Sequence, residues 1–288
     1  MKIIISHDID HITPSEHLND LILPKYAARS AIELMLGRIT PIELLKRGKG
    51  LLANRWNNIA DLMDFDRQSG VPSTFFIGVS KGMGLSYSLA DVEHWSKAIL
   101  MRGFDLCVHG ISFDDFSRIR TERETFSKIT GLQDFGIRMH YLRLNFETLS
   151  HLERAGYSYD SSVYQIKNPF KMGKLWEFPL HIMDSRIFCG NARWQARTLE
   201  ETKYLTQKLI DDISRRGINY LTILFHDLYF CNSYRSWKDW YIWLIEYLID
   251  NKLSFTSHKS AIKDLERFSE GRNDPDFIGK SERPFYSL

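Results

Sequence analysis

The stretch KIIISHDIDH, residues 2–11, joins an apolar run directly to a group of charged side chains. The three isoleucines near its start are typical of a short buried strand in a parallel sheet. The titratable residues that follow within five positions are His7, Asp8, Asp10 and His11. Burying carboxylates is costly unless they are paired or bind a cation. The stretch alone leaves two interpretations open: the strand ends in water, or it delivers two carboxylates into a site.

The composition indicates a globular protein with a substantial core. Of 288 residues, 43% are hydrophobic and 13% aromatic. The 38 basic and 36 acidic side chains give a net charge of +2, so nothing favours a nucleic-acid partner. No apolar run approaches the roughly 20 residues that cross a bilayer, and the first residues lack the pattern of a secretory signal. Three widely spaced cysteines favour a reducing compartment. We therefore expect a cytoplasmic protein.

Short apolar segments alternate with longer helical patterns along the chain. The predicted strands are residues 2–7, 73–79, 104–109, 137–144, 157–163, 175–183, 220–226 and 253–256. The predicted helices lie near residues 53–68, 89–102, 121–130, 146–155, 198–215, 236–250 and 259–268. This alternation predicts an α/β fold, a distorted (β/α) barrel of about seven to eight parallel strands. No repeat, low-complexity tract or linker divides the chain, so residues 1–288 are expected to form one domain.

The connection between the first two strands is over sixty residues long, far more than a crossover requires. The resulting insertion, about residues 12–56, contains an amphipathic and locally basic stretch. We expect a helical pair that caps the barrel; the alternatives are a lid, a partner surface or a peripheral membrane contact. The sequence does not indicate an oligomeric state.

Polar residues gather where the predicted strands end, which is where barrels of this type carry their active sites. Strand alternation puts Asp8 and Asp10 on one face, and Arg138 with His140 on one face of another strand. Asp10, His109 and His140 could supply one carboxylate and two imidazoles to a divalent cation, as in many catalytic zinc sites. Asp8 would then be a general base beside the metal. Arg138 would keep Asp8 ionised, because a nearby cation lowers the pKa of a carboxyl group.

Five motifs in order carry a resemblance to a known family: SHDID at 6–10, STFFIG at 73–78, CVHGISF at 107–113, GIRMHY at 136–141 and LTILFHD at 221–227. With these, the chain resembles the polysaccharide deacetylase (NodB-homology) family, metal-dependent enzymes that remove acetyl from N-acetylated sugars on a distorted (β/α) barrel. The resemblance implies that Asp8 is the base, Asp10 a metal ligand and Arg138 the residue that orients the base. It implies that His226 is the general acid and that Leu224 lies near the acetyl methyl.

The chain departs from the family pattern at two places. The family has a second metal-binding histidine four residues after the first, where this chain has Phe113. A divergent branch of the family with an HYLR motif, present here at 140–143, implies His140 as the ligand; Asp114 is the reserve candidate. The carboxylate that tunes His226 is also not evident. We expect Glu177 in that role, with Asp184 as the second choice.

The resemblance implies a hydrolase of non-peptide carbon–nitrogen bonds that acts on the N-acetyl amide of a sugar. A role in surface polysaccharide or glycan-precursor metabolism is expected, with an N-acetylated, nucleotide-linked or lipid-linked sugar as substrate and zinc as the expected metal. Tyr141 and Trp176 could line a sugar cleft, because aromatic faces suit pyranose rings, or could serve only in packing. Two alternatives remain: an inactive, glycan-binding barrel, which Phe113 favours, and a hydrolase of another small amide.

Overall fold

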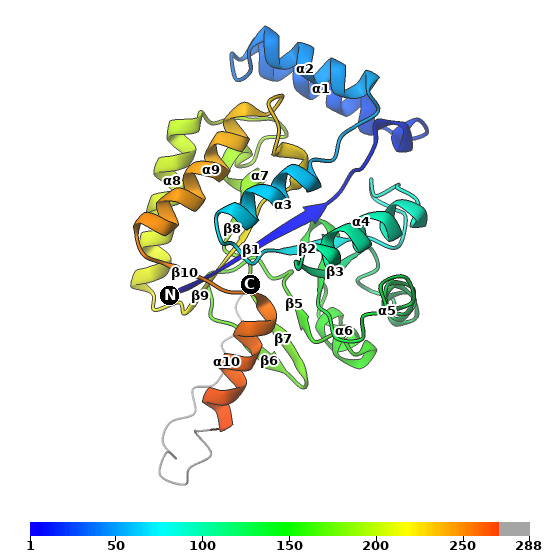
Figure 1. Cartoon of the computed structure of the whole chain (residues 1–288), viewed down its shortest axis with the longest axis vertical. Helices are drawn as coiled ribbons and strands as arrows, with labels where there is room; N and C mark the ends of the chain where they lie inside the picture. Colours follow the sequence, from blue (N-terminus) through cyan, green and yellow to red (C-terminus); the bar gives the residue numbers. More distant parts are fainter. Residues whose placement is uncertain (271–288) are drawn as a thin grey trace.

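A curled sheet of mostly parallel strands surrounds β1 (Lys2–Ile9), which is buried from Ile3 to its end. The computed structural model describes residues 1–270 (Figure 1). The strand order is β6-β7-β5-β4-β3-β2-β1-β9-β8, and β10 also pairs with β1. The other strands are β2 (Thr74–Ile77), β3 (Asp105–Gly110), β4 (Ile137–Met139), β5 (Tyr159–Asp160), β6 (Phe170–Met172), β7 (Leu175–Glu177), β8 (Ile182–Met183), β9 (Tyr220–Leu224) and β10 (Ser254–Phe255). The predicted distorted (β/α) barrel is confirmed.

Helices connect the strands and cover the outside of the sheet (Figure 1). They are α3 (Ile59–Gln68), α4 (Leu89–Met101), α5 (Phe116–Thr130), α6 (Thr148–Ala155), α7 (Asp184–Cys189), α8 (Leu199–Arg215), α9 (Arg235–Asp250) and α10 (His258–Glu270). Local sequence signals explain their limits. Thr198 caps α8 by accepting from the backbone of Glu201, and Gly131 ends α5 with a φ of 75° that other residues rarely adopt.

One bent segment joins the two ends of the curled sheet. Residues 175–183 were expected to form a single strand, but Pro179 divides it, because proline has no N–H to give to a neighbouring strand. The first part, β7, pairs with β5, and the second part, β8, pairs with β9. The segment therefore contacts strands on both sides of the barrel. The antiparallel pair β6–β7 is the exception to the parallel pattern.

The segment between β1 and α3 contains the turn η1 (Pro14–His17) and two helices, α1 (Ile22–Met35) and α2 (Pro41–Leu52). In Figure 1 the two helices lie at the edge of the molecule, on the side toward which β1 points. The predicted domain ran to residue 288, so its last part, 271–288, lies outside the described residues.

A buried polar network holds β1 on the face opposite to Asp8. His7 faces away from Asp8, and its two ring nitrogens contact the carbonyl of Phe225 and Oδ2 of Asp66, each at 2.8 Å. The Asp66 carboxylate also accepts from the hydroxyl of Tyr241 at 2.8 Å. These contacts tie β1 to α3 and α9, because buried polar groups need hydrogen-bond partners.

Candidate active site

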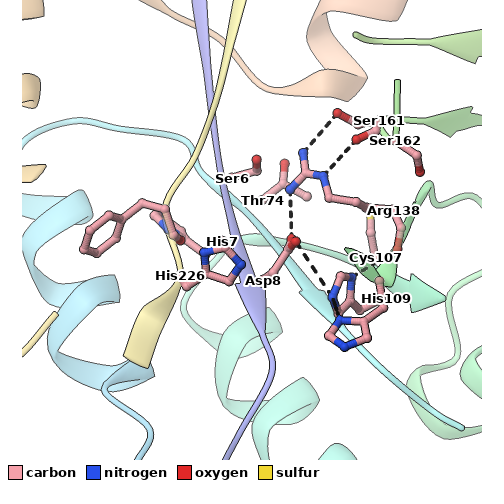
Figure 2. A network of polar contacts seen from close by, with 12 residues as sticks. Ser6, His7, Asp8, Thr74, Cys107, His109, Arg138, Ser161, Ser162 and His226 are labelled. Atoms are coloured by element: carbon pink, nitrogen blue, oxygen red, sulfur yellow. Dashed lines mark hydrogen bonds and ion pairs between the residues drawn. The ribbon is translucent and has the colours of Figure 1, made fainter. Parts of the chain in front are cut away.

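Asp8 is held by Arg138 at the carboxyl end of β1. Its Oδ1 lies 2.8 Å from Nη1 of Arg138, and its Oδ2 lies 3.8 Å from Nε2 of His109 (Figure 2). Arg138 is fixed in turn by Ser161, whose carbonyl accepts from Nε at 2.9 Å and whose hydroxyl accepts from Nη2 at 3.0 Å. Burial raises the pKa of Asp8, but the charges of Arg138 and His109 outweigh it and hold the pKa below its ordinary value. Asp8 is therefore a buried carboxylate that stays ionised.

Asp10, His109 and His140 form a second group on the same face. Oδ1 of Asp10 lies 3.2 Å from Nε2 of His109 and 3.3 Å from Nδ1 of His140, and these two nitrogens are 2.9 Å apart. The other nitrogen of each imidazole contacts a backbone carbonyl at 3.1 Å: Nδ1 of His109 that of Arg138, and Nε2 of His140 that of Met83. A carbonyl can only accept, so each imidazole donates there. In the neutral rings, two nitrogen lone pairs therefore face each other and a carboxylate oxygen.

This arrangement is unfavourable by itself and fits a cation. Two lone pairs and a carboxylate oxygen repel one another, and Oδ1 of Asp10 is buried without a hydrogen-bond donor among the described residues. Zinc takes imidazole and carboxylate ligands, and ligand atoms around a tetrahedral zinc ion lie about 3.3 Å apart. The separations here are 2.9, 3.2 and 3.3 Å. The three side chains therefore fit a divalent cation such as zinc.

The inward position of His140 depends on an unusual backbone turn. β4 ends at Met139, and Tyr141 and Leu142 have φ values of 59° and 54°. Residues other than glycine rarely adopt this left-handed conformation, and strain of this kind often occurs at functional sites. The turn leaves His140 buried while the side chain of Tyr141 stays 63% exposed. The strand predicted over residues 137–144 therefore ends at residue 139.

His226 follows β9 and faces the same group from the other side. Asp184 holds it twice: Oδ1 accepts from Nδ1 at 2.8 Å, and Oδ2 accepts from the backbone N–H at 2.7 Å. Nε2 is left facing the site, 3.7 Å from Oδ2 of Asp10. Burial lowers the pKa of His226, but Asp184, and then Asp10 and Asp8, raise it to about 10. His226 is therefore a protonated group at neutral pH.

Glu177, which the sequence analysis places beside His226, lies elsewhere. Its Oε1 accepts from the backbone N–H of Val163 at 3.1 Å, and its carboxyl group interacts with Asp160. Burial raises the pKa of Glu177, and the charge of Asp160 raises it further. The chain bends at the intervening proline, so Glu177 stays beside β5 while Asp184, the second choice, contacts the imidazole. The assignment of Glu177 is therefore corrected to Asp184.

Sequence reasoning gave no role to Asp227, although it adjoins His226. Its Oδ2 accepts from the backbone N–H of Asn58 at 3.1 Å, whereas Oδ1 is buried without a donor among the described residues. Burial raises the pKa of Asp227 to about 8, so this carboxyl group is protonated at neutral pH. The carbonyl of Met83 was also missed. A backbone acceptor has no signal in the residue types, so nothing in the sequence could have revealed it.

Tyr141, which could line a sugar cleft, and Leu224, which was expected near the acetyl methyl, both lie near the site. The ring of Tyr141 adjoins that of His140, with centroids 4.0 Å apart. Leu224 is buried in a small apolar cluster with Leu180 and Met183, separate from the main core. Because Met183 precedes Asp184 in the chain, this cluster lies beside the contact that holds the imidazole of His226.

Trp176, the other residue that could line a sugar cleft, packs elsewhere. Strand alternation turns it to the opposite face of β7 from its neighbour, and its Nε1 lies 3.5 Å from Oε1 of Glu266 in α10. Of the two roles left open for Trp176, the structure therefore favours packing. Phe113 lies under the guanidinium of Arg143 at 4.9 Å, and the reserve ligand Asp114 is exposed and outside the cluster of potential metal ligands.

Comparison with known proteins supports the fold assignment. No family model matches the chain, and no curated protein matches it significantly. The chain is similar in structure to a Mycobacterium smegmatis protein described as a polysaccharide deacetylase, with 15% identity, a TM-score of 0.65, and coverage of 98% of this chain and 94% of that one. A Pseudomonas aeruginosa protein of the same description is 13% identical, with a TM-score of 0.58 and coverage of 95% of this chain and 91% of that one. The PuuE allantoinase is 11% identical, with a TM-score of 0.61 and coverage of 94% of this chain and 90% of that one. At these identities the similarity shows the fold, a deacetylase-like (β/α) barrel.

Replacement of the proposed ligands should separate metal binding from the rest of the site. Asp10→Ala and His140→Ala should each remove one zinc ion per chain, because each deletes a donor that the other two cannot replace. Asp8→Asn should keep that ion, because Asp8 is not one of the three clustered ligands and its carboxylate is held by Arg138. Elemental analysis of the dialysed proteins measures this, with circular dichroism as the check on folding. Unchanged zinc content in folded His140→Ala would remove that residue from the ligand set.

Proposed function

We propose that the protein is a metal-dependent deacetylase that hydrolyses the N-acetyl amide of a sugar. The observation that carries the proposal is the position of Asp8. It stays ionised against Arg138, 3.8 Å from Nε2 of His109, and yet it is not one of the three clustered ligands. On the opposite side, His226 supplies a protonated nitrogen. A base, a cation site and an acid in this order suit hydrolysis of an amide.

The chain's own residues would each perform one part of the reaction. When bound to Asp10, His109 and His140, a divalent cation supplies Lewis acidity, which polarises a carbonyl and makes water easier to deprotonate. Asp8 would accept the proton of the attacking water, and Arg138 would keep it ionised until then. His226 would donate the proton on Nε2 to the departing amine, since a free amide anion is a poor leaving group.

The environment of the site supports an acetyl group as the acyl part. The apolar cluster of Leu180, Met183 and Leu224 lies beside the His226–Asp184 pair and suits a methyl group. The backbone N–H of Tyr141 is the proposed donor to the oxyanion that forms when water adds to the carbonyl. The exposed ring of Tyr141 would then contact the sugar.

Another small amide is the second candidate substrate class. The fold similarity to a protein named as an allantoinase favours it, because an amide other than that of an acetylated sugar is then compatible with this barrel. The inactive, glycan-binding alternative rested on Phe113. The position of His140 weakens it, because this imidazole completes a three-ligand cluster without a histidine at position 113.

Acetate release tests the proposal. The zinc-loaded protein should release acetate from one or more N-acetylated sugars in a panel of free oligosaccharides, nucleotide-linked sugars and lipid-linked sugars. Asp8→Asn should lower turnover by about 10²–10⁴-fold with zinc content retained, because it removes the proton acceptor. Asp64→Asn, an exposed carboxylate on α3, is the matched control. Full activity in Asp8→Asn would contradict the role of this residue, and ring opening of allantoin to allantoate without acetate release would favour the second candidate.

The pH dependence should identify Asp184 as the partner of His226. As the general acid, His226 works while protonated, so activity is present below its pKa and is lost as pH rises through it. Asp184 raises this pKa, so Asp184→Asn should move the alkaline limb of kcat/KM to lower pH by about one unit or more. The exposed Asp211→Asn should leave the profile unchanged. An unshifted limb in Asp184→Asn would assign the limb to another group.

We further propose that α1 and α2 bind an anionic membrane surface, which would favour a lipid-linked sugar as substrate. In this helix pair charged side chains are buried and apolar side chains are exposed, the reverse of an ordinary surface helix. Its charged side chains Glu33, Glu43 and Arg47 are buried, and Nη1 of Arg47 lies 2.7 Å from Oε2 of Glu33. The apolar side chains on its outside, 53–90% exposed, are Leu21, Met35, Leu36, Ile42, Leu45 and Leu52.

The exposed charges of this surface have one sign. Both acidic residues between positions 21 and 56 are buried, whereas the exposed charged residues there are Lys25, Lys46, Lys49 and Arg55, the last of which pairs with Asp61 at 3.4 Å. Like charges oppose pairing of two copies through this face, and they favour anionic lipid headgroups. Residues 1–270 contain no helix both long and apolar enough to cross a membrane. The helix pair would therefore lie on the lipid surface, with its leucines in the headgroup region.

Vesicle sedimentation tests this contact. The protein should bind phosphatidylcholine vesicles that contain phosphatidylglycerol, and much more weakly vesicles of phosphatidylcholine alone. The double variant Leu45→Glu/Leu52→Glu should bind the anionic vesicles about tenfold less or worse, because it places two carboxylates against the lipid and offsets part of the positive charge of this surface. Ile249→Glu, an exposed position on α9, is the control and should bind normally. Absent binding of the wild type, or a dimer that the double variant dissolves, would contradict the proposal.

A further inference from the structure

A second group of metal-binding side chains follows the first along the chain. His11, Glu16 and His17 each direct one ligand atom into a space in which these atoms lie within 4.8 Å of one another. The backbone builds this group: the N–H groups of Ile12 and Thr13 donate to the Glu16 carboxylate at 3.0 and 3.2 Å, which closes the turn η1. The turn brings the two imidazole rings to a centroid distance of 4.7 Å. The proposed deacetylase chemistry uses none of these three residues.

Two buried nitrogens in this group have no hydrogen-bond partner among the described residues. They are Nδ1 of His11 and Nε2 of His17. The side chain of His17 is fully buried, and that of His11 is 16% exposed. Oε1 of Glu16 lies 3.0 Å from Nε2 of His17, but not in the geometry of a hydrogen bond. Unpartnered buried polar atoms are rare in folded proteins, and each needs an explanation.

Asp20 determines which nitrogen of His17 carries the proton. Its Oδ2 accepts from Nδ1 of His17 at 2.8 Å, and its Oδ1 accepts from the backbone N–H of Ile22 at 2.8 Å. In the neutral ring, Nε2 then presents a lone pair toward the carboxylate of Glu16. A carboxylate that accepts from the outer nitrogen of an imidazole is the usual partner of a metal-binding histidine. The arrangement thus has both the ligand atoms of a metal site and their supporting contact.

We propose that His11, Glu16 and His17 form a second divalent-cation site of the kind that takes zinc. Two imidazoles and one carboxylate are a zinc donor set, whereas calcium and magnesium favour oxygen ligands alone. Oε1 of Glu16 lies 3.0 Å from Nε2 of His17 and 4.0 Å from Nδ1 of His11, on either side of the spacing of about 3.3 Å around a tetrahedral ion. A divalent cation also balances the two negative charges of Glu16 and Asp20.

The site lies where the insertion leaves and rejoins the barrel. The ring of Trp56 packs on both imidazoles, at centroid distances of 5.6 Å from His11 and 5.5 Å from His17. The backbone N–H groups of Trp56 and Asn57 both donate to the carbonyl of Ile12, at 3.1 and 3.2 Å. A cation held by the two histidines would therefore fix the departing end of the insertion directly, and the returning end through the packing of Trp56. This role is structural and does not depend on the deacetylase activity.

Metal counting in matched variants tests the second site. The full chain is stripped with a chelator, reloaded with zinc and dialysed, and about two ions per chain are expected. His17→Asn should bind one, because asparagine keeps an N–H for Asp20 but lacks Nε2. Asp10→Ala/His140→Ala, which removes the first centre, should also bind one. His94→Asn, an exposed histidine on α4, should still bind two.

A second readout separates this site from the proposed active site. In the Asp10→Ala/His140→Ala background, added zinc should raise the Tm by several degrees, and it should have no such effect once His17→Asn is added. If His17→Asn does not fold by circular dichroism, Glu16→Gln takes its place. Zinc content equal to wild type in these variants, or no zinc in Asp10→Ala/His140→Ala, would overturn the proposal. The latter result would leave the ion pairs of His17 with Glu16 and Asp20 as the explanation of this group.

Discussion

The site depends on the two backbone carbonyls that hold the imidazoles of His109 and His140. By accepting from the outer nitrogens, the carbonyls of Arg138 and Met83 turn the inner nitrogens toward Asp10 as lone pairs. Without these contacts the rings could exchange protons and satisfy one another. With them, three electron-rich atoms converge, and either a cation or a proton on His109, whose pKa is raised, against the effect of burial, by Asp8 and Asp10, relieves the repulsion. The barrel thus builds a cation site mainly through its backbone, with side chains as the contact points.

Burial sets the charge state of each carboxyl group differently around this centre. Arg138 keeps Asp8 ionised, whereas Asp227 and Glu177 are buried with too little compensation, so burial raises the pKa of each. Asp184 has its charge matched by a protonated His226. Environments that lower the pKa of one group and raise the pKa of another allow one fold to provide both a proton acceptor and a proton donor at neutral pH.

The two-residue alternation along strands and the capping residues of helices made much of the fold and part of the site predictable from the sequence. Strand alternation alone predicted that Asp8 and Asp10 share one face, and the alternation of strands and helices along the chain predicted the parallel sheet. The failures have a common cause, because they depend on contacts between distant segments. The sequence pattern does not distinguish Glu177 from Asp184 as the carboxylate partner of His226, and only the bend at Pro179 decides between them. The group of His11, Glu16 and His17 was missed although the Thr-x-x-Glu capping pattern at residues 13–16 was visible, because a cap and a ligand use the same residue type.

The bent segment of residues 175–183 has a consequence for how the site of the proposed hydrolase can vary. One end pairs with β5, next to the serine that fixes Arg138, and the other leads into Asp184, which holds His226. The pairing of β1 with β9 sets the gap between Asp8 and His226, and this segment supports the partners of both: the carbonyl of Phe178 accepts from Ser161, and the segment leads into Asp184. If the protein is the proposed hydrolase, an added residue here would disturb both supports together, whereas a longer surface loop would not. Differences in substrate are then expected outside this segment.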